Sequence, residues 1–122
     1  MYELKKDQLC KVAHLVRGEL FPKPEVTSVI EGNNPGWIFV NDLSSPTTAI
    51  IWPQGMEGFH FAGDENDKHF LENINEYVDE VLQSRLKGFG FNFFEVSGDN
   101  KSWNKTIEKV FTHRNWMSVP NM

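Results

Sequence analysis

Cysteine is nearly absent from this sequence, because Cys10 is the only one. A single cysteine excludes an intramolecular disulfide framework and a cysteine-based zinc site, and it suits a reducing compartment. No apolar run approaches the roughly 20 residues that span a bilayer, and residues 1–7 do not read as a signal peptide. We therefore expect a soluble, cytoplasmic protein with no membrane partner.

Positive charge is also scarce. The chain has 12 basic and 17 acidic residues, which gives a formal net charge of −5. This balance argues against a general nucleic-acid binder. A chain of 122 residues is long enough to bury a core, and it has the size of one domain, which we place at residues 1–122.

Hydrophobic periodicity and turn residues predict a mixed α/β domain, with a largely antiparallel sheet flanked by helices in the order α-α-β-β-β-α-β-α. The predicted helices cover 9–16, 25–31, 67–88 and 103–111, and the predicted strands cover 37–40, 47–52, 56–62 and 91–96. Asp67 is predicted to cap the longest helix and Gly88 to end it. Because this helix joins two strands, we expect a right-handed crossover with the outer strands parallel. Residues 112–122 show no clear period.

The histidines offer one candidate metal site. His60 and His69 could approach each other across the turn at Gly63, and Asp64 could join them. His14 and His113 have no ligand-type residue four positions later. Ordinary surface or half-buried histidines are the more common outcome, so we predict no metal site.

Nucleophiles and carboxylates give weak signals. Cys10 is predicted to pack on the apolar side of the first helix, as an inert thiol. Ser97 precedes a glycine but lacks a Gly-x-Ser-x-Gly elbow, which disfavours a Ser-His-Asp hydrolase. Glu95 shares a predicted strand face with Phe91 and Phe93, so it is either a partly buried acid or base or a strand end that faces water, and we favour the second. The acids of the longest helix are predicted to form a solvated face: Glu72, Glu76, Asp79 and Glu80.

Aromatic residues are the most distinctive content of the predicted strands. Their positions are Trp37, Phe39, Trp52, Phe59, Phe61, Phe91, Phe93 and Phe94. Most are predicted to form the core, because a sheet covered by helices needs large side chains. An aromatic ligand cleft at the edge of the sheet stays open as an alternative.

Neither candidate phosphate loop has the expected chemistry. The glycines of 87–90 follow a helix rather than a strand, so they are predicted to stop that helix. Residues 63–67 lie between a strand and a helix, where a phosphate could bind, but they read Gly-Asp-Glu-Asn-Asp. Acids at a helix N-terminus stabilise the helix themselves and repel a pyrophosphate.

Three stretches and the order of the elements resemble a known family. The stretches are Asn33–Asp42, Ser45–Trp52 and Gly58–Asp64, followed by Ser97–Trp103 and its helix. Together, over roughly residues 10–111, they look like the N-terminal half of the bacterial GNAT acetyltransferases similar to the zwittermicin A resistance protein. The resemblance implies a GNAT-like fold and transfer of an acetyl group from acetyl-CoA to an amine.

The resemblance also implies that the two halves of a full-length member differ in cofactor binding. Full-length members look like two GNAT-type halves, and the Gln/Arg-x-x-Gly-x-Gly/Ala cofactor signature lies in the C-terminal half. This chain has no such signature, and it ends soon after 103–111, where a GNAT fold still has a final strand or two. We therefore assign no catalytic, cofactor-binding or metal residues. Acetyl-CoA is the cofactor of the family, and the implied partner is a C-terminal catalytic half or a second copy.

Three functions stay in competition. The first is the cofactor-poor half of an acetyltransferase. The second is a non-catalytic domain, left from a truncated acetyltransferase, that binds a ligand or partner or dimerises. The third is a self-sufficient acetyltransferase with an atypical cofactor loop, and the acids at 64, 65 and 67 count against it.

Overall fold

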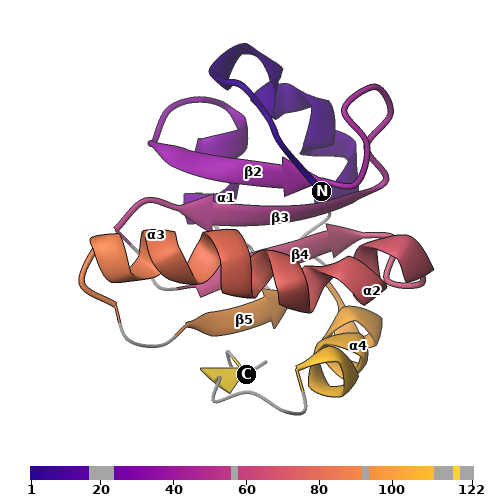
Figure 1. The fold of residues 1–122 in the computed structure, drawn as a ribbon. Coiled ribbons are helices and arrows are strands. Elements are labelled where there is room, and N and C mark those ends of the chain that lie inside the picture. The colour runs from indigo at the N-terminus through magenta and orange to yellow at the C-terminus, as the bar shows by residue number, and fades with distance from the viewer. Residues whose placement is uncertain (17–23, 56–57, 92–93, 112–116, 119–122) are drawn as a thin grey trace.

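A computed structural model shows a six-stranded sheet with helices on both faces (Figure 1). It describes all residues except 17–23, 56–57, 92–93, 112–116 and 119–122. The strands follow one another in space as they do along the chain, from β1 to β6. The predicted mixed fold, with a largely antiparallel sheet and flanking helices, is confirmed.

The strands and helices have the following bounds. The strands are β1 (Tyr2–Glu3), β2 (Gly36–Val40), β3 (Thr48–Pro53), β4 (Gly58–Gly63), β5 (Glu95–Gly98) and β6 (Met117–Ser118). The helices are η1 (Lys6–Leu15), α1 (Pro24–Ile30), α2 (Lys68–Tyr77), η2 (Val78–Leu82), α3 (Gln83–Gly88) and α4 (Lys101–Val110). None of them, within the described residues, has the length and hydropathy needed to cross a bilayer.

Strands β2, β3 and β4 form the antiparallel meander that the turn residues predicted. Trp37 pairs with Trp52, and Ala49 pairs with Ala62. Asn41 closes the loop between β2 and β3, because its side-chain oxygen accepts hydrogen bonds from the backbone N–H groups of Thr47 and Thr48, at 3.0 and 3.1 Å. This bonding fixes where β3 starts, and therefore its register.

The crossover between β4 and β5 is parallel, as predicted. It runs through α2, η2 and α3, which follow one another without a break and lie in front of the sheet in Figure 1. Asp67 caps α2, because its carboxylate accepts a hydrogen bond from the backbone N–H of Phe70 at 3.1 Å. The middle segment, η2, is a π-helix.

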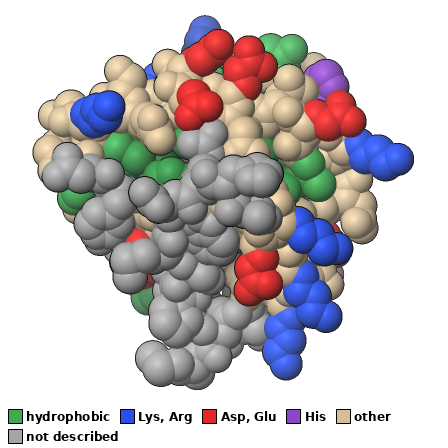
Figure 2. All heavy atoms as spheres, turned by 60° about the horizontal axis from the view of Figure 1, so that its bottom comes forward, with side chains coloured by type: hydrophobic (Ala, Val, Ile, Leu, Met, Phe, Trp, Pro, Cys, Tyr) green, Lys and Arg blue, Asp and Glu red, His purple; other side chains and the backbone are tan. Residues whose placement is uncertain are grey.

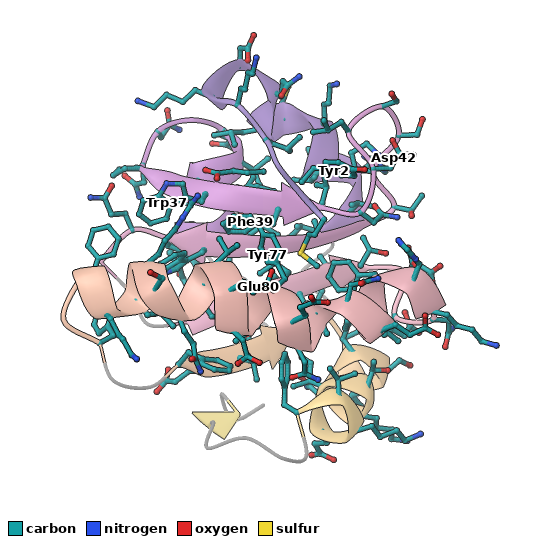
Figure 3. The ribbon with its side chains drawn as sticks, viewed as in Figure 1. Tyr2, Trp37, Phe39, Asp42, Tyr77 and Glu80 are labelled. Carbon is teal, nitrogen blue, oxygen red and sulfur yellow. The ribbon has the colours of Figure 1, made fainter. Side chains whose placement is uncertain are left out.

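Both faces of the sheet are apolar, which is why the strands read as nearly continuous hydrophobic runs. Phe39, Ile50 and Phe61 point toward the crossover helices and α4, whereas their neighbours Ile38 and Ile51 point toward η1 and α1. Figure 3 shows Phe39 and Tyr77 between β2 and the long helix, and their ring centroids lie 5.5 Å apart. Each face has its own buried cluster.

The short strand β1 was not predicted. It pairs with β2, and an ion pair between Glu3 and Arg85, with N···O 2.6 Å, connects it to α3. The hydrogen bond from Arg85 to Glu3 raises the pKa of the guanidinium. Burial raises the pKa of Tyr77, which lies beside the same pair. The N-terminal segment therefore closes the edge of the sheet next to the long helix.

The prediction for Cys10 was wrong, because the side chain is exposed. The first helix, η1, is a 3₁₀ helix rather than an α-helix. With three residues per turn, Leu9 and Val12 align on the buried face and Cys10 points away from it. Leu15 continues the row and packs against the same cluster.

The C-terminal strands also differ from the prediction. The predicted strand 91–96 begins later, since β5 starts at Glu95, and Asn92 and Phe93 lie outside the described residues. Ser97 and Gly98, which lie beyond the predicted strand, belong to β5. A further strand, β6, pairs in parallel with β5.

Substitutions in η1 test its 3₁₀ register. Val12→Ala removes two methyl groups from a side chain with 0 % exposure, so we expect the free energy of unfolding to fall by about 2 kcal/mol. Cys10→Ala, two positions earlier, should change it by less than about 0.5 kcal/mol. Urea denaturation of both variants measures the difference. Equal losses would contradict the register.

Candidate functional site

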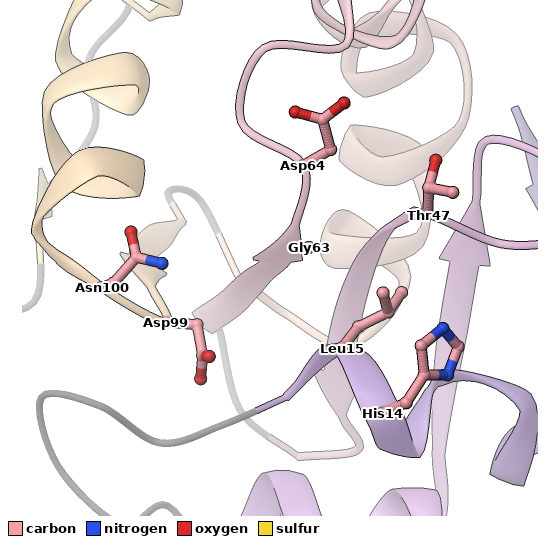
Figure 4. A pocket seen from close by; sticks show the side chains of 7 residues that line it. All are labelled: His14, Leu15, Thr47, Gly63, Asp64, Asp99 and Asn100. Carbon is pink, nitrogen blue, oxygen red and sulfur yellow. The ribbon is translucent and has the colours of Figure 1, made fainter.

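A pocket lies at the carboxyl ends of β4 and β5, where α2 and α4 begin (Figure 4). Ligands of sheets with parallel strands bind in this position, outside the carboxyl ends of the strands. The pocket, called the β4 pocket below, has a volume of about 310 Å³. The lining residues are His14, Leu15, Thr47, Gly63, Asp64, Asp99 and Asn100.

Three buried polar side chains meet beside this pocket. His60 on β4 is paired in register with Ser97 on β5, and its Nδ1 lies 3.1 Å from the Ser97 hydroxyl. Its Nε2 lies 3.1 Å from a carboxylate oxygen of Asp99, which itself lines the pocket. The exposed fractions are 4 % for His60, 6 % for Ser97 and 3 % for Asp99. This set, called the His60 bridge below, joins the two parallel strands.

The His60 bridge is arranged for hydrogen bonding rather than for attack on a substrate. An ionised carboxylate only accepts hydrogen bonds, so Nε2–H of His60 donates to Asp99. In the neutral imidazole, Nδ1 then accepts from the hydroxyl of Ser97. Because the hydroxyl is buried and engaged with the imidazole, Ser97 is not presented to the pocket. The arrangement satisfies the polar groups that β4 and β5 would otherwise bury without partners.

At the start of α2, backbone N–H groups donate hydrogen bonds to carboxylates of the chain itself. Asp64 accepts a hydrogen bond from the backbone N–H of Asn66 at 2.9 Å, and Asp67 accepts one from that of Phe70 at 3.1 Å. The second oxygen of Asp67 accepts from the side chain of Asn41 at 2.8 Å. Asp67 therefore takes the place that an external anion takes at a helix N-terminus.

The end of β4 is also held by groups of the chain itself. The carbonyl of Gly63 accepts a hydrogen bond from the indole N–H of Trp103 at 2.9 Å. The backbone N–H of Asp64 donates to the carbonyl of Thr47 at 2.8 Å. A side chain at Gly63 has no room, because its Cβ would clash with that same carbonyl and the residue has a φ of +94°. Backbone geometry therefore requires glycine at this position.

The candidate metal ligands do not converge. His60 is buried against β5, whereas His69 is exposed on α2 and Asp64 is exposed in the loop. Within the part of the chain that the structure describes, no group of three His, Cys, Asp or Glu side chains could hold a metal ion. His113 lies outside that part.

The other predicted candidates lie away from the pocket. Glu95 is half-buried at the first position of β5, opposite Gly58, and therefore at the far end of that strand from Asp99. Cys10 is exposed on η1. His14, given no role from the sequence, lines the pocket.

A comparison with known protein families shows which family the chain belongs to. Residues 14–119 match the GNAT acetyltransferase family. The chain therefore belongs to this family, and the membership indicates an acetyltransferase-like function, with acetyl-CoA as the cofactor that the family generally binds. No curated protein matches the chain.

The loop that precedes α2 does not fit the pyrophosphate of this cofactor. The backbone N–H of Asn66 in the loop is already bonded to Asp64, and that of Phe70 in the first turn of α2 is bonded to Asp67. Glu65 adds a third acid within the same five residues, 63–67. Bound pyrophosphate would have to displace carboxylates from the N–H groups and remain beside them, and like charges at such short range repel.

Removing one end of the His60 bridge tests its contribution to stability. Asp99→Ala leaves the Nε2–H of His60 buried without this acceptor, so we expect the free energy of unfolding to fall by about 1–3 kcal/mol. Asp64→Ala is the control, because Asp64 also lines the pocket but is exposed. It should cost less than about 1 kcal/mol.

Chemical denaturation of the two variants provides the comparison. A loss for Asp99→Ala no larger than that for Asp64→Ala would show that the bridge does not hold β4 against β5.

Proposed function

We propose that this chain is the cofactor-poor, N-terminal half of a GNAT acetyltransferase, of the bacterial group similar to the zwittermicin A resistance protein. In this proposal it does not bind acetyl-CoA. It contributes one wall of a substrate cleft, or an interface, to a catalytic half that transfers the acetyl group to an amine. The protein works in the cytoplasm, without a metal.

The observation that carries the proposal is the chemistry of the loop between β4 and α2. The chain has a loop between β4 and α2, in a position where a phosphate could bind to a helix N-terminus. The N–H group of Asn66 in this loop is bonded to the carboxylate of Asp64, and that of Phe70 in the first turn of α2 is bonded to the carboxylate of Asp67. A half that has lost its cofactor site keeps the fold and replaces the phosphate with its own acids, which stabilise α2.

The partner in this proposal is a catalytic half or a second copy of the chain, rather than nucleic acid. The net charge of −5 does not favour a polyanion. Acidic and basic side chains both stand on the face shown in Figure 2. A mixed surface of this kind suits association with another protein better than association with a phosphate backbone.

A second candidate function is a non-catalytic domain that binds a small ligand. The β4 pocket supports it, because the pocket is preformed and lies beside the His60 bridge. The reading frame beyond codon 122 separates the two candidates. A downstream segment with the Gly-rich cofactor signature supports the half-enzyme, and its absence supports the ligand-binding domain.

Calorimetry with acetyl-CoA tests the proposal. We expect no saturable heat up to about 1 mM cofactor, a limit that corresponds to a binding free energy weaker than about −4 kcal/mol. Micromolar binding by this chain would overturn both candidates and make it a self-sufficient acetyltransferase.

A pair of charge variants tests whether the acids of the loop are what excludes the pyrophosphate of the cofactor. Asp64→Asn with Glu65→Gln removes two negative charges from the loop, and Glu72→Gln with Glu76→Gln removes two from the exposed face of α2. Two unit charges near a phosphate contribute about 1.4 kcal/mol in water-like surroundings, so the loop variant should bind inorganic pyrophosphate about tenfold more tightly than the helix variant. Equal affinities would show that the loop acids are not what excludes the anion.

A further inference from the structure

A second pocket lies at the opposite end of β3 from the β4 pocket. β3 begins at Thr48, next to Thr47 of the first pocket, and ends at Pro53, next to Gln54 of the second. The second pocket, called the β2 pocket, has a volume of about 360 Å³ and is formed by η1, the turn before β2 and the end of β3. The proposed function gives it no role.

Three polar side chains of the β2 pocket have no partner of their own. Lys6, Asn34 and Gln54 line it, and none of the three side chains makes a hydrogen bond or ion pair within the described residues. They come from three separate segments of the chain. All three side chains are exposed, so their polar groups are available to a small ligand that enters the pocket.

The charge of the β2 pocket is opposite to that of the β4 pocket. Its lining includes the ammonium group of Lys6 and no carboxylate. The nearest acid in sequence to the turn is Glu31, which is exposed and accepts a hydrogen bond from the side chain of Asn33 at 3.2 Å. The β4 pocket, by contrast, is lined by Asp64 and Asp99. The β2 pocket therefore favours an anionic group.

The backbone around the β2 pocket argues against a phosphate. Phosphate sites usually use several free backbone N–H groups. The N–H of Gly32 donates to the carbonyl of Val29, and those of Asn33 and Asn34 donate to the carbonyl of Ser28. With these N–H groups used and one lysine present, the pocket matches a single negative charge, as on a carboxylate. The amides of Asn34 and Gln54 can each donate and accept, so they match a neighbouring amide or hydroxyl of the ligand.

The walls of the β2 pocket are held in place. The backbone N–H of Gln54 donates to the carbonyl of Pro35 at 3.1 Å, which joins the end of β3 to the turn before β2. Gly36 packs so closely that a Cβ would lie 2.7 Å from the carbonyl oxygen of Trp52. Leu9 and Trp37 provide apolar surface in the same lining. The backbone and the apolar walls of the pocket are therefore preformed, and a ligand has to order only the three exposed polar side chains.

We propose that the β2 pocket binds a small monocarboxylate that carries an amide or hydroxyl group next to its carboxylate. The ammonium of Lys6 pairs with the carboxylate, and Asn34 and Gln54 bond the neighbouring polar group. The ligand buries its apolar atoms against Leu9 and Trp37. This site is independent of acetyl-CoA.

Titration with N-acetylglycine, followed by amide chemical shifts in nuclear magnetic resonance, tests the site. We expect saturable shifts at Leu9, Asn34 and Gln54, with a millimolar dissociation constant. Lys6→Met should weaken binding about tenfold, the loss expected for one charge-assisted hydrogen bond. Lys5→Met is the matched control, because Lys5 is an exposed neighbour outside the lining, and it should leave the affinity unchanged.

The uncharged analogue N-acetylglycinamide tests the ligand class. Binding of the analogue as tight as that of N-acetylglycine would overturn the assignment to a carboxylate. Shifts that gather around Asp64 and Asp99 instead, or no saturable shift up to about 50 mM, well beyond the millimolar range of weak ligands, would overturn the site itself. Asn34→Ala with Gln54→Ala, both exposed positions, provides a second variant that should also lose affinity.

Discussion

The parallel pairing of β4 with β5 is the constraint on which the rest of the structure depends. Parallel neighbours cannot be joined by a tight turn and need a long crossover, which α2, η2 and α3 supply. The same pairing places the carboxyl ends of both strands at one edge, where two helices begin, and so creates the β4 pocket. It also sets His60 opposite Ser97, and without that register the buried imidazole would lack one of its two partners.

The edge built by this pairing is suited to an anion, yet the chain fills it with its own acids. Helix N-termini carry partial positive charge and unbonded N–H groups, and Asp67 supplies the carboxylate that α2 needs. Because the N–H of Phe70 is bonded to Asp67, it is no longer available to bind a phosphate. Membership of the GNAT acetyltransferase family therefore favours a cofactor site, whereas the chemistry of this loop disfavours one. The proposed half-enzyme accounts for both.

Features with a local signal were predictable from the sequence. The Asp67 cap and the long helix follow from spacing and capping preferences within a few turns of chain. The parallel crossover follows from the order strand, helix, strand. The His60 bridge could not be predicted, because His60 lies 37 residues from Ser97 and 39 from Asp99, and only the strand register brings them together. Cys10 was misplaced because apolar spacing was read with the period of an α-helix, whereas a 3₁₀ helix turns every three residues. Strands of two residues, such as β1 and β6, are too short to show a period.

The two pockets differ in the sign of the charge that lines them, and they are far enough apart to act separately. β3 runs between them from Thr48 to Pro53, and at about 3.3 Å per residue it separates them by roughly 17–20 Å. This distance exceeds the Debye length of about 8 Å at physiological ionic strength, so the acids of the β4 pocket scarcely reduce the attraction of Lys6 for an anion. One small ligand cannot contact both pockets. The exclusion of an anionic cofactor that we propose for one end of the sheet is therefore compatible with the proposed binding of a carboxylate at the other end.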